Sequence, residues 1–543
     1  MSFTQPWSWT LLALFAVVIW KISRVGRRPG SFPPGPPTLP LIGNLHQIPQ
    51  NRSHEQFKKW ADEYGPIYSL ILGTRRVVVL NTDQGVKDML DKRGSIYSSR
   101  PDSHITDIVT GGLSFAMMKY SDTWKMCHRI FQASLSPKAA GAYLPYQRLE
   151  NLQMLNELVD DPSQFRASIR RYTHSLMTQL VLGFRTVNNG DPKLQQLYSD
   201  FEAWSELLGK AISVIVDLYE PLRFLPDALL PVRQQAKKLH QAQLGLFLDH
   251  WRSARKRIQD QTSQPCMAQD VLKAQKEEGF SDDLASYICG FLLIAGSDTI
   301  STQLTVFLEA MILFPDVQRV AQEELDKVCG DRLPDKDDQA NLPYIHAMIK
   351  ESCRWMPSAI LGIPHANIKD DEYLGYKIPK DTVIITNVWA IHNDPNRHKN
   401  PRAFDPARYL HDRNSSRQSA LSPDVTQRDH FLFGSGRRLC SGMDIAENSL
   451  FLSISRILWA FNISKEKDAD GNEITPDPDD IVGGLAAMPA KFPAKILPRS
   501  EQREKAVRDA WKSAQEHLHE GTGQWNHVPE DLPYAQVNIK SKV

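Results

Sequence analysis

The stretch FLFGSGRRLCSGMDIAENSLFLSISRILWAF, residues 431–461, contains the pattern that decides the fold. Glycines at positions 434, 436 and 442 surround a single cysteine, Cys440, and an amphipathic helix is predicted to begin at Ser441. The free backbone N–H groups and the dipole at the start of a helix favour the thiolate form of a cysteine. Because the thiolate is the form that binds metals, this loop predicts a metal ligand at Cys440.

Three other interpretations explain this loop less completely. A dinucleotide-binding fingerprint needs a third glycine where Leu439 stands, and no βαβ pattern frames the segment. A nucleophilic cysteine needs a basic partner, and this interpretation stays open because the partner could come from anywhere in the chain. A buried structural cysteine leaves the crowding of Arg437, Arg438 and three glycines around one thiol unexplained.

The pattern F-x-x-G-x-R-x-C-x-G, formed by Phe433, Gly436, Arg438, Cys440 and Gly442, resembles the haem-binding loop of the cytochrome P450 family. Five fixed positions within ten residues make this match specific. The resemblance implies that the Cys440 thiolate ligates the iron of haem b and favours O–O cleavage. It also implies that Phe433 shields the sulfur from water, that the glycines admit backbone amides near it, and that Arg438 pairs with a haem propionate.

A second segment, AGSDT at 295–299, resembles the oxygen-binding part of the same family. In that comparison Gly296 lets haem and O₂ approach the helix backbone, and the acid–alcohol pair Asp298 and Thr299 passes protons to the distal oxygen. A small-residue helix crossing with a solvated aspartate would also explain the segment. An idle carboxylate is costly to bury on an otherwise apolar helix, however, so the catalytic interpretation is preferred.

Three further positions match the family at a distance from the cysteine. Glu351 and Arg354 lie three residues apart on one predicted helical face, and Arg408 in the segment PARY supplies the expected third partner of a Glu–Arg–Arg network. This network would be structural and would hold the shape of the haem pocket. His365 matches a position that offers a donor to a propionate, although an isolated histidine is the simple alternative.

One motif departs from the family pattern. Family members usually carry W-x-x-x-R near the haem, whereas here Trp124 is followed four residues later by His128. Both side chains share one helical face, so we expect the imidazole to take the place of the guanidinium beside the propionate, with less charge and shorter reach.

Composition agrees with a large globular enzyme. The chain of 543 residues has 64 basic and 63 acidic side chains, and this net charge of +1 argues against nucleic acid as a partner. Six cysteines without a C-x-x-C pair exclude a disulfide scaffold or a zinc ribbon.

The fold class expected from the resemblance is mainly α with small β-sheets, in one large haem domain. Helical periodicity predicts helices at 137–162, 196–215, 233–260, 281–313 and 316–329, and β-rich runs lie at 68–81 and 382–388.

The amino terminus is predicted to be a membrane anchor. Its first twenty residues carry no charged side chain, and basic residues follow them directly, which places the remainder of the chain in the cytosol. A cleaved signal peptide would have the opposite arrangement of charges. We therefore predict a single-pass protein of the endoplasmic reticulum membrane. Its segments are the transmembrane anchor at 1–22, a basic Pro-rich hinge at 23–40, the haem-thiolate domain at 41–499 and a polar extension with a loose tail at 500–543.

The resemblance implies a haem-thiolate monooxygenase that oxidises an apolar small molecule. The chain has neither a complete dinucleotide loop nor a P-loop, so an NADPH-dependent cytochrome reductase in the same membrane must deliver the electrons, with Lys125 and Arg129 as candidate contacts. By family position the substrate pocket draws on 105–118, Phe291, Ile294, 359–361 and 485–488.

In its details the chain looks like membrane-bound enzymes of filamentous fungi that modify secondary metabolites. The alternatives are a haem-thiolate isomerase or dehydratase that needs no reductase, and a non-catalytic haem-binding membrane protein. Asp298 and Thr299 argue against the isomerase, which has less use for a proton relay.

Overall fold

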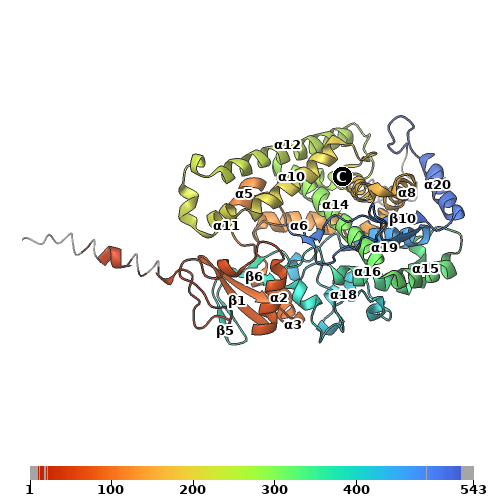
Figure 1. The fold of residues 1–543 in the computed structure, drawn as a ribbon. Coiled ribbons are helices and arrows are strands. Elements are labelled where there is room, and N and C mark those ends of the chain that lie inside the picture. The colour runs from red at the N-terminus through yellow and green to blue at the C-terminus, as the bar shows by residue number, and fades with distance from the viewer. Residues whose placement is uncertain (1–9, 11–12, 18–19, 21–22, 485, 527–543) are drawn as a thin grey trace, which may run out of the picture.

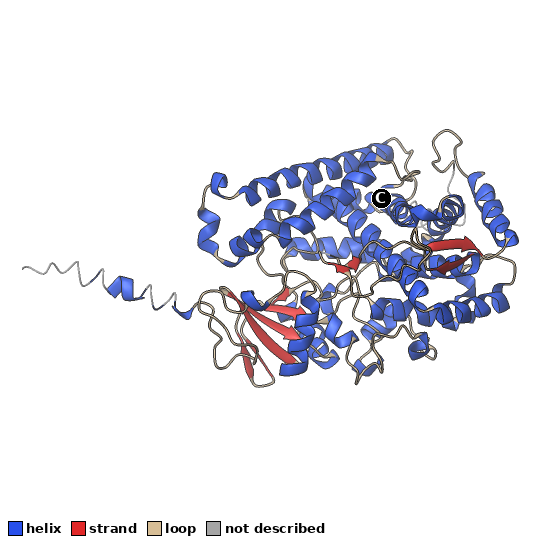
Figure 2. Ribbon diagram, in the orientation of Figure 1, coloured by secondary structure: helices blue, strands red, loops and turns tan. Residues whose placement is uncertain are grey.

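The computed structural model describes residues 10, 13–17, 20, 23–484 and 486–526. It is mainly helical with small sheets, as predicted (Figure 2). The four-stranded sheet lies at the end of the molecule from which the N-terminal segment leaves, and helices form most of the remainder, with small two-stranded sheets among them (Figure 1). Most of the predicted anchor at 1–22 lies outside the described residues, and so do residues 527–543.

The longer helices are α2 (Ser53–Tyr64), α5 (His104–Thr110), α6 (Asp122–Ser134), α8 (Leu144–Asp160), α9 (Phe165–Leu182), α10 (Pro192–Gly209), α11 (Ala211–Leu218), α12 (Pro231–Gln259), α13 (Ala268–Glu278), α14 (Asp282–Leu313), α15 (Pro315–Cys329), α16 (Pro343–Trp355), α19 (Met443–Ala460) and α20 (Glu501–Gln515). The short ones are α3 (Asp83–Val86), α4 (Gly94–Tyr97), α7 (Pro137–Ala142), α17 (Val388–His392) and α18 (Ser416–Leu421). A π-helix, η2, spans Lys87–Lys92. Single 3₁₀ segments are η1 (Leu45–Gln47), η3 (Pro162–Gln164), η4 (Glu220–Phe224), η5 (Asp227–Leu229), η6 (Lys336–Asn341), η7 (Pro406–Tyr409), η8 (Val425–Gln427) and η9 (Gly436–Arg438).

Helix α14 is the central element of the helical body, as its all-round apolar sequence predicts. Ser281 caps its start by accepting a hydrogen bond from the N–H of Leu284, and Pro315 follows its end. It packs against α9, α12, α16 and α19. Among the described residues it is the one helix long and apolar enough to cross a bilayer, but most of its apolar stretch is buried inside the protein. It is therefore a core helix.

The largest sheet has four strands in the order β1-β2-β6-β3. The predicted hairpin at 68–81 is confirmed: its two strands pair antiparallel, with Ile67 opposite Leu80. The predicted strand at 382–388 ends earlier, because Asn387 caps α17 by accepting from the N–H of Ala390. The strands are β1 (Ile67–Leu72), β2 (Arg75–Leu80), β3 (His365–Ala366), β4 (Asp371–Tyr373), β5 (Tyr376–Ile378), β6 (Val383–Thr386), β7 (Phe461–Ser464), β8 (Ile481–Val482), β9 (Met488–Pro489) and β10 (Lys495–Pro498).

Two predicted helices are each divided in the structure. The helix expected at 137–162 breaks at Tyr143 between α7 and α8, because Pro145 lacks the N–H that would continue the hydrogen-bond ladder. The helix expected at 196–215 breaks at Lys210, whose backbone is extended directly after Gly209. Local turn chemistry therefore overrides the helical periodicity at both places.

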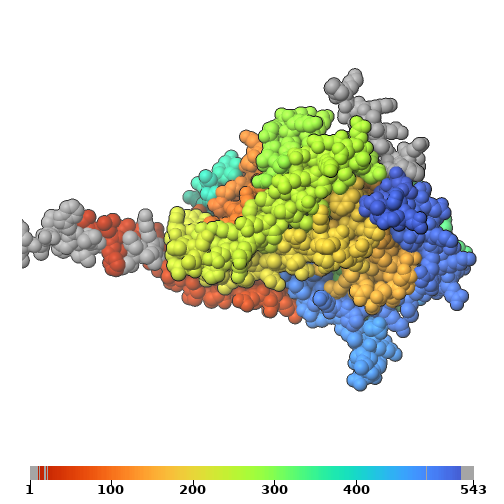
Figure 3. All heavy atoms as spheres, turned by 90° about the horizontal axis from the view of Figure 1, so that it is seen from above, coloured from red at the N-terminus to blue at the C-terminus, as the bar shows by residue number. Residues whose placement is uncertain are grey.

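The C-terminal extension differs most from its prediction. The extension contains one described helix, α20, which lies against α8 (Figure 3). At this contact Arg508 pairs with Asp160 at 2.6 Å. The expected loose tail does not begin directly after it. Residues 516–526 fold back onto the body, and Trp525 is buried to 9% exposure.

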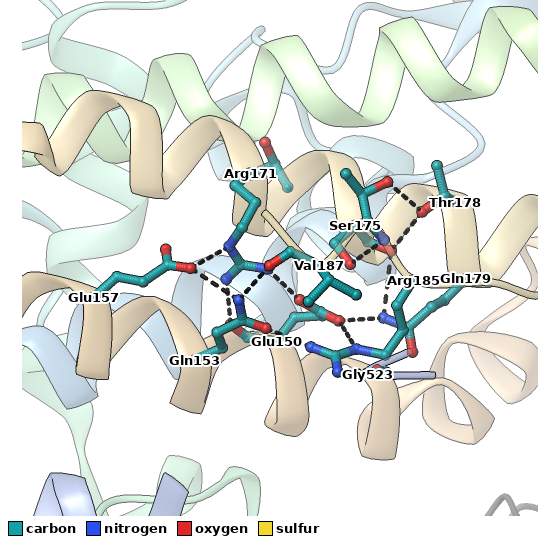
Figure 4. A network of polar contacts seen from close by, with 12 residues as sticks. Glu150, Gln153, Glu157, Arg171, Ser175, Thr178, Gln179, Arg185, Val187 and Gly523 are labelled. Atoms are coloured by element: carbon teal, nitrogen blue, oxygen red, sulfur yellow. Dashed lines mark hydrogen bonds and ion pairs between the residues drawn. The ribbon is translucent and has the colours of Figure 1, made fainter. Parts of the chain in front are cut away.

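This tail meets a buried charge network between α8 and α9 (Figure 4). Glu150 accepts from Arg171 at 2.6 Å and from Arg185 at 2.6 Å, and all three side chains are almost fully buried. The Arg185 guanidinium also donates to the carbonyl of Gly523 at 2.6 Å. Beside it, the Trp525 indole N–H donates to Gln179 Oε1 at 2.6 Å. The tail therefore satisfies polar groups that would otherwise be buried without partners.

We predict that Trp525→Ala destabilises the fold by about 3 kcal/mol, because it removes both a buried aromatic ring and a buried hydrogen bond. Thermal or denaturant unfolding of the full chain measures this effect. Trp525→Phe keeps most of the packing and should lose about 1 kcal/mol. Equal stability of Trp525→Ala and the wild type would show that residues 516–526 do not dock.

Candidate functional site

A cavity of about 310 Å³ lies beside α14 and is bordered by α6, the cysteine loop (residues 431–442) and the segment at 358–365. Its walls are largely apolar and include the rings of Phe115, Phe131 and Phe291. Three arginines and the thiol of Cys440 also border it. The cavity thus combines an apolar interior with concentrated positive charge.

The cysteine loop owes its shape to close packing against η2. Gly436 has a φ of +62°, and a Cβ at this position would collide with the carbonyl oxygen of Leu90. Its N–H donates to Asp91 Oδ1 at 2.7 Å. Gly436 itself does not line the cavity, whereas Phe433 and Gly442 do. The geometry therefore places Gly436 at the docking contact of the loop and not beside the sulfur.

Cys440 presents its side chain to the cavity directly before α19. Its backbone N–H donates to the carbonyl of Phe433 at 2.9 Å, which closes the loop. Removal from bulk water raises the pKa of the Cys440 thiol, and the N–H of Gly442 offsets this only in part. The N–H groups at the start of the helix therefore do not by themselves outweigh the effect of desolvation on the pKa of this thiol. A bound metal cation would supply the missing stabilisation.

Two of the arginines have no counter-ion in the described part of the chain, and of these Arg100 is buried and Arg438 is half-buried. Arg438 donates to the carbonyls of Ser98, Phe115 and Met118, and Arg100 donates to those of Ala116, Ile363 and Pro364. No carboxylate in the described part of the chain contacts either guanidinium. Desolvation lowers the pKa of Arg438 to about 9, and desolvation followed by repulsion from Arg438 lowers that of Arg100. Because these two guanidinium groups have no carboxylate partner in the described chain, an anionic ligand would bind favourably beside them.

Trp124 and His128 form an aromatic wall on α6. Their rings stack 4.7 Å apart, and the Arg438 guanidinium lies 4.2 Å from the Trp124 ring centre. The indole Nε1 is buried and has no hydrogen-bond partner within the described chain. Desolvation, followed by the charge of Arg438, lowers the pKa of His128, so its imidazole is neutral. The charge of the missing family arginine is available instead from Arg100, which sequence reasoning overlooked.

His365 is buried at the edge of the same cavity. Its Nδ1 lies 2.8 Å from the carbonyl of Tyr97 and therefore donates to it. Desolvation, followed by the charge of Arg100, holds the pKa of His365 well below its ordinary value. The ring is thus a neutral, oriented group at the cavity edge.

The structure does not bring the predicted acid–alcohol pair together on the cavity wall. Thr299 lines the cavity, and its hydroxyl donates to the carbonyl of Ala295 at 2.6 Å. Asp298 is buried on another face of α14, where desolvation raises its pKa to about 6 despite the charge of Arg170. Gly296 borders the cavity, but a Cβ there would collide with Met177 of α9. Gly296 therefore lies both at the cavity wall and at the contact between α14 and α9.

Glu351, Arg354 and Arg408 do come together behind the loop. Arg354 Nε lies 2.6 Å from Glu351 Oε2, and Arg408 Nε lies 3.3 Å from Glu351 Oε1. Glu351 and Arg354 are fully buried. Glu351 also accepts from the N–H of Asp405 at 2.8 Å, so the network joins α16 to the segment that precedes η7.

Haem b fits the chemistry of this site. Its macrocycle matches the apolar walls, and its two propionates would neutralise Arg438 and Arg100 and accept from Trp124 Nε1. The described residues contain no cluster of three or more histidine, cysteine or carboxylate side chains that could hold a metal ion. An iron held by a porphyrin needs only one such ligand, and Cys440 faces the cavity.

The pocket predicted from family position is partly reproduced. Phe115, Phe291, Ala359 and Ala486 line the cavity, whereas Ile294 does not, and Leu485 lies outside the described residues. Arg100 could have been noticed only as a cation directly before Pro101, which is a weak signal. Its importance comes from contacts with residues more than 260 positions away.

Comparisons with known proteins agree with this geometry. Residues 33–491 match the family model described as Cytochrome P450. Cytochrome P450 monooxygenase virE of Hypocrea virens is 49% identical over 532 residues, covering 98% of this chain and 96% of the relative. Cytochrome P450 monooxygenase fogE of Aspergillus ruber is 48% identical, covering 96% of this chain and 97% of the relative.

A third relative, cytochrome P450 monooxygenase fsoB of Humicola fuscoatra, is 47% identical, covering 97% of this chain and 98% of the relative. The similarity therefore extends through the C-terminal extension. With the cysteine loop, the apolar cavity and its unpaired cations, these matches show that the chain belongs to the cytochrome P450 family, the haem-thiolate monooxygenases.

Proposed function

We propose that Cys440 is the thiolate ligand of haem b, and that the enzyme inserts one oxygen atom from O₂ into an apolar small molecule. One observation carries this proposal: the thiol of Cys440 and two guanidinium groups without carboxylate partners in the described chain, Arg100 buried and Arg438 half-buried, border the same apolar cavity. A structural cysteine would not be exposed to a cavity.

The residues around the cavity take separate parts in holding the cofactor. Arg438 and Arg100 bind the propionates by charge, and Trp124 donates its indole N–H to one of them. His365 and His128 act as neutral groups at the same edge. Phe433 covers the sulfur side and limits access of water, while Glu351, Arg354 and Arg408 keep the supporting backbone in place.

Thiolate-ligated haem, when bound, activates O₂ with two electrons and leaves the second oxygen atom as water. Thr299 presents the one side-chain hydroxyl that α14 places on the cavity wall within the described chain, so it holds a proton donor there. Asp298 is the next residue toward the N-terminus; it is buried, desolvation raises its pKa to about 6, and it does not line the cavity.

The electrons come from an NADPH-dependent cytochrome reductase in this proposal. Lys125 and Arg129 are exposed on α6 and remain candidate contacts, although each already pairs with a carboxylate, Asp122 and Glu278 respectively. Their effective charge toward a partner is reduced by that pairing. The aromatic rings on the cavity wall favour an apolar, ring-containing substrate, and the fungal relatives support a tailoring step in secondary metabolism.

We further propose attachment to the endoplasmic reticulum membrane through residues 1–22 and a neighbouring apolar surface. Leu39 of the hinge and Leu41 directly after the hinge are exposed. The Tyr219 hydroxyl donates to the carbonyl of Leu41 at 3.0 Å, which ties the end of the hinge to the segment after α11. That segment exposes Phe224 to 88% and Leu229 to 65%. The N-terminal chain leaves the body at this end (Figure 1).

The ligand assignment predicts that Cys440→Ser abolishes the far-red-shifted Soret band of the reduced, carbon monoxide-bound protein, since serine does not supply a thiolate. Absorption difference spectra of the purified full chain measure this band. Cys289→Ala is the matched control, because that thiol is buried on α14 and does not line the cavity. A band that persists in Cys440→Ser would sink the proposal.

The proton-donor role predicts that Thr299→Ala lowers product formed per NADPH consumed by about tenfold or more, with the difference released as hydrogen peroxide. The assay uses reductase, NADPH and a converted substrate. Thr299→Ser should restore coupling, and Thr302→Val serves as a control on a buried face of the same helix. Full turnover without any reductant would instead identify an isomerase or dehydratase.

The membrane proposal predicts two separable contributions to vesicle binding. Removing residues 1–22 should weaken binding without abolishing it. In the chain without residues 1–22, the double change Phe224→Ser and Leu229→Ser should weaken vesicle binding by about tenfold or more. Burying each apolar side chain in the membrane contributes about 1.5–3 kcal/mol to the free energy of binding. Flotation with phosphatidylcholine–phosphatidylserine vesicles measures binding. Leu421→Ser, an equally exposed change on α18, should have no effect, and an equal loss there would contradict the assignment.

A further inference from the structure

His392 is a fully buried histidine at the end of α17, between the Glu–Arg–Arg network and the cysteine loop. Its Nδ1 lies 2.9 Å from the carbonyl oxygen of Arg354, and its Nε2 accepts from the backbone N–H of Phe431 at 2.8 Å. The Arg354 guanidinium returns a hydrogen bond to the carbonyl of His392 at 3.0 Å. Both ring nitrogens and the carbonyl of this residue are thus engaged.

These partners fix the chemical state of the ring. The carbonyl of Arg354 can only accept, so Nδ1 must carry the hydrogen, and the N–H of Phe431 can only donate, so Nε2 must be unprotonated. A second proton would place two N–H groups against each other. The surrounding groups act in the same direction, because burial and then the neighbouring His430, Arg397, Arg354 and His398 hold the pKa of His392 well below its ordinary value.

The hydrogen bond to Phe431 reaches the cysteine through the backbone of the loop. Phe431 accepts through its carbonyl from the N–H of Gly434 at 3.0 Å. Two residues further on, the carbonyl of Phe433 accepts from the N–H of Cys440 at 2.9 Å. The imidazole therefore fixes the first residue of a loop whose middle is held at Gly436 and whose last residues lead into α19.

We propose that His392 is a positioning residue for the iron ligand: it joins the buried Glu351–Arg354 pair to the backbone of Phe431 and so sets the position from which Cys440 presents its sulfur. This inference rests on the proposed ligation of iron by Cys440. The acceptor at Nε2 is the decisive atom, because it is the only one of the three contacts that reaches the loop.

Two variants of nearly equal size separate the two ring nitrogens. In His392→Gln the amide oxygen can take the place of Nε2 and accept from Phe431, whereas in His392→Asn the amide N–H takes the place of Nδ1 and leaves Phe431 without an acceptor. We expect the Gln variant to keep most of the thiolate-type carbon monoxide band. The Asn variant should show a several-fold larger fraction without that band, at unchanged helix content.

The measurement uses the full-length holoenzyme, with absorption spectra and circular dichroism taken on the same samples. His430→Asn is the matched control, because that ring is equally buried beside Phe431 and has no hydrogen-bond partner among the described residues. Its spectrum should match the wild type. Equal spectra of the Asn and Gln variants, or a loss that simply follows unfolding, would overturn the inference.

A further measurement needs no variant. Hydrogen–deuterium exchange of wild-type holoenzyme should show the Phe431 amide as protected as the interior of α19, and rapid exchange there would also overturn the inference. A wild-type protein without the thiolate band would instead overturn the proposed function, so the two failures are distinguishable.

Discussion

The anchoring of the cysteine loop is the constraint on which the geometry of the site depends. A segment rich in glycine has many accessible backbone conformations, and holding it in one costs conformational entropy. Here the loop is held at three places: the N–H of Phe431 on His392, the backbone of Gly436 against η2, and the start of α19 after Gly442. Each contact satisfies a backbone group that would otherwise be buried without a partner.

Electrostatics links this loop to the cavity. Arg438 lies within the loop, and Arg100 reaches the same wall from a distant segment, and neither has a carboxylate partner in the described chain. Removing two unpaired cations from water, Arg100 fully and Arg438 in part, is unfavourable. An anionic ligand that binds only the folded protein therefore gains affinity and also stabilises the fold. The cavity therefore carries positive charge that no carboxylate of the described chain neutralises.

The C-terminal extension shows that an element outside the matched family segment can still belong to the core. The family model ends at residue 491, yet Trp525 and Gly523 complete the buried network around Glu150. That network ties α8 to α9, and α9 presents Met177 to Gly296 of α14. A chain of packed contacts thus joins the tail to the wall of the cavity.

The sequence by itself determined the features that depend on local spacing. These are the loop around Cys440, the apolar helix α14, the β1–β2 hairpin and the pairing of Glu351 with Arg354, since each follows from residues that are close together or continuous in the sequence. Only the tertiary structure decided which residues from distant parts of the sequence come into contact. It placed Asp298 away from the cavity, supplied Arg100 where the family arginine is replaced by His128, and docked residues 516–526 of the C-terminal extension onto the body. The reason is physical: a cation, a carboxylate or an indole acquires its role from partners brought within hydrogen-bond distance by packing, and those partners stand hundreds of residues away in the chain.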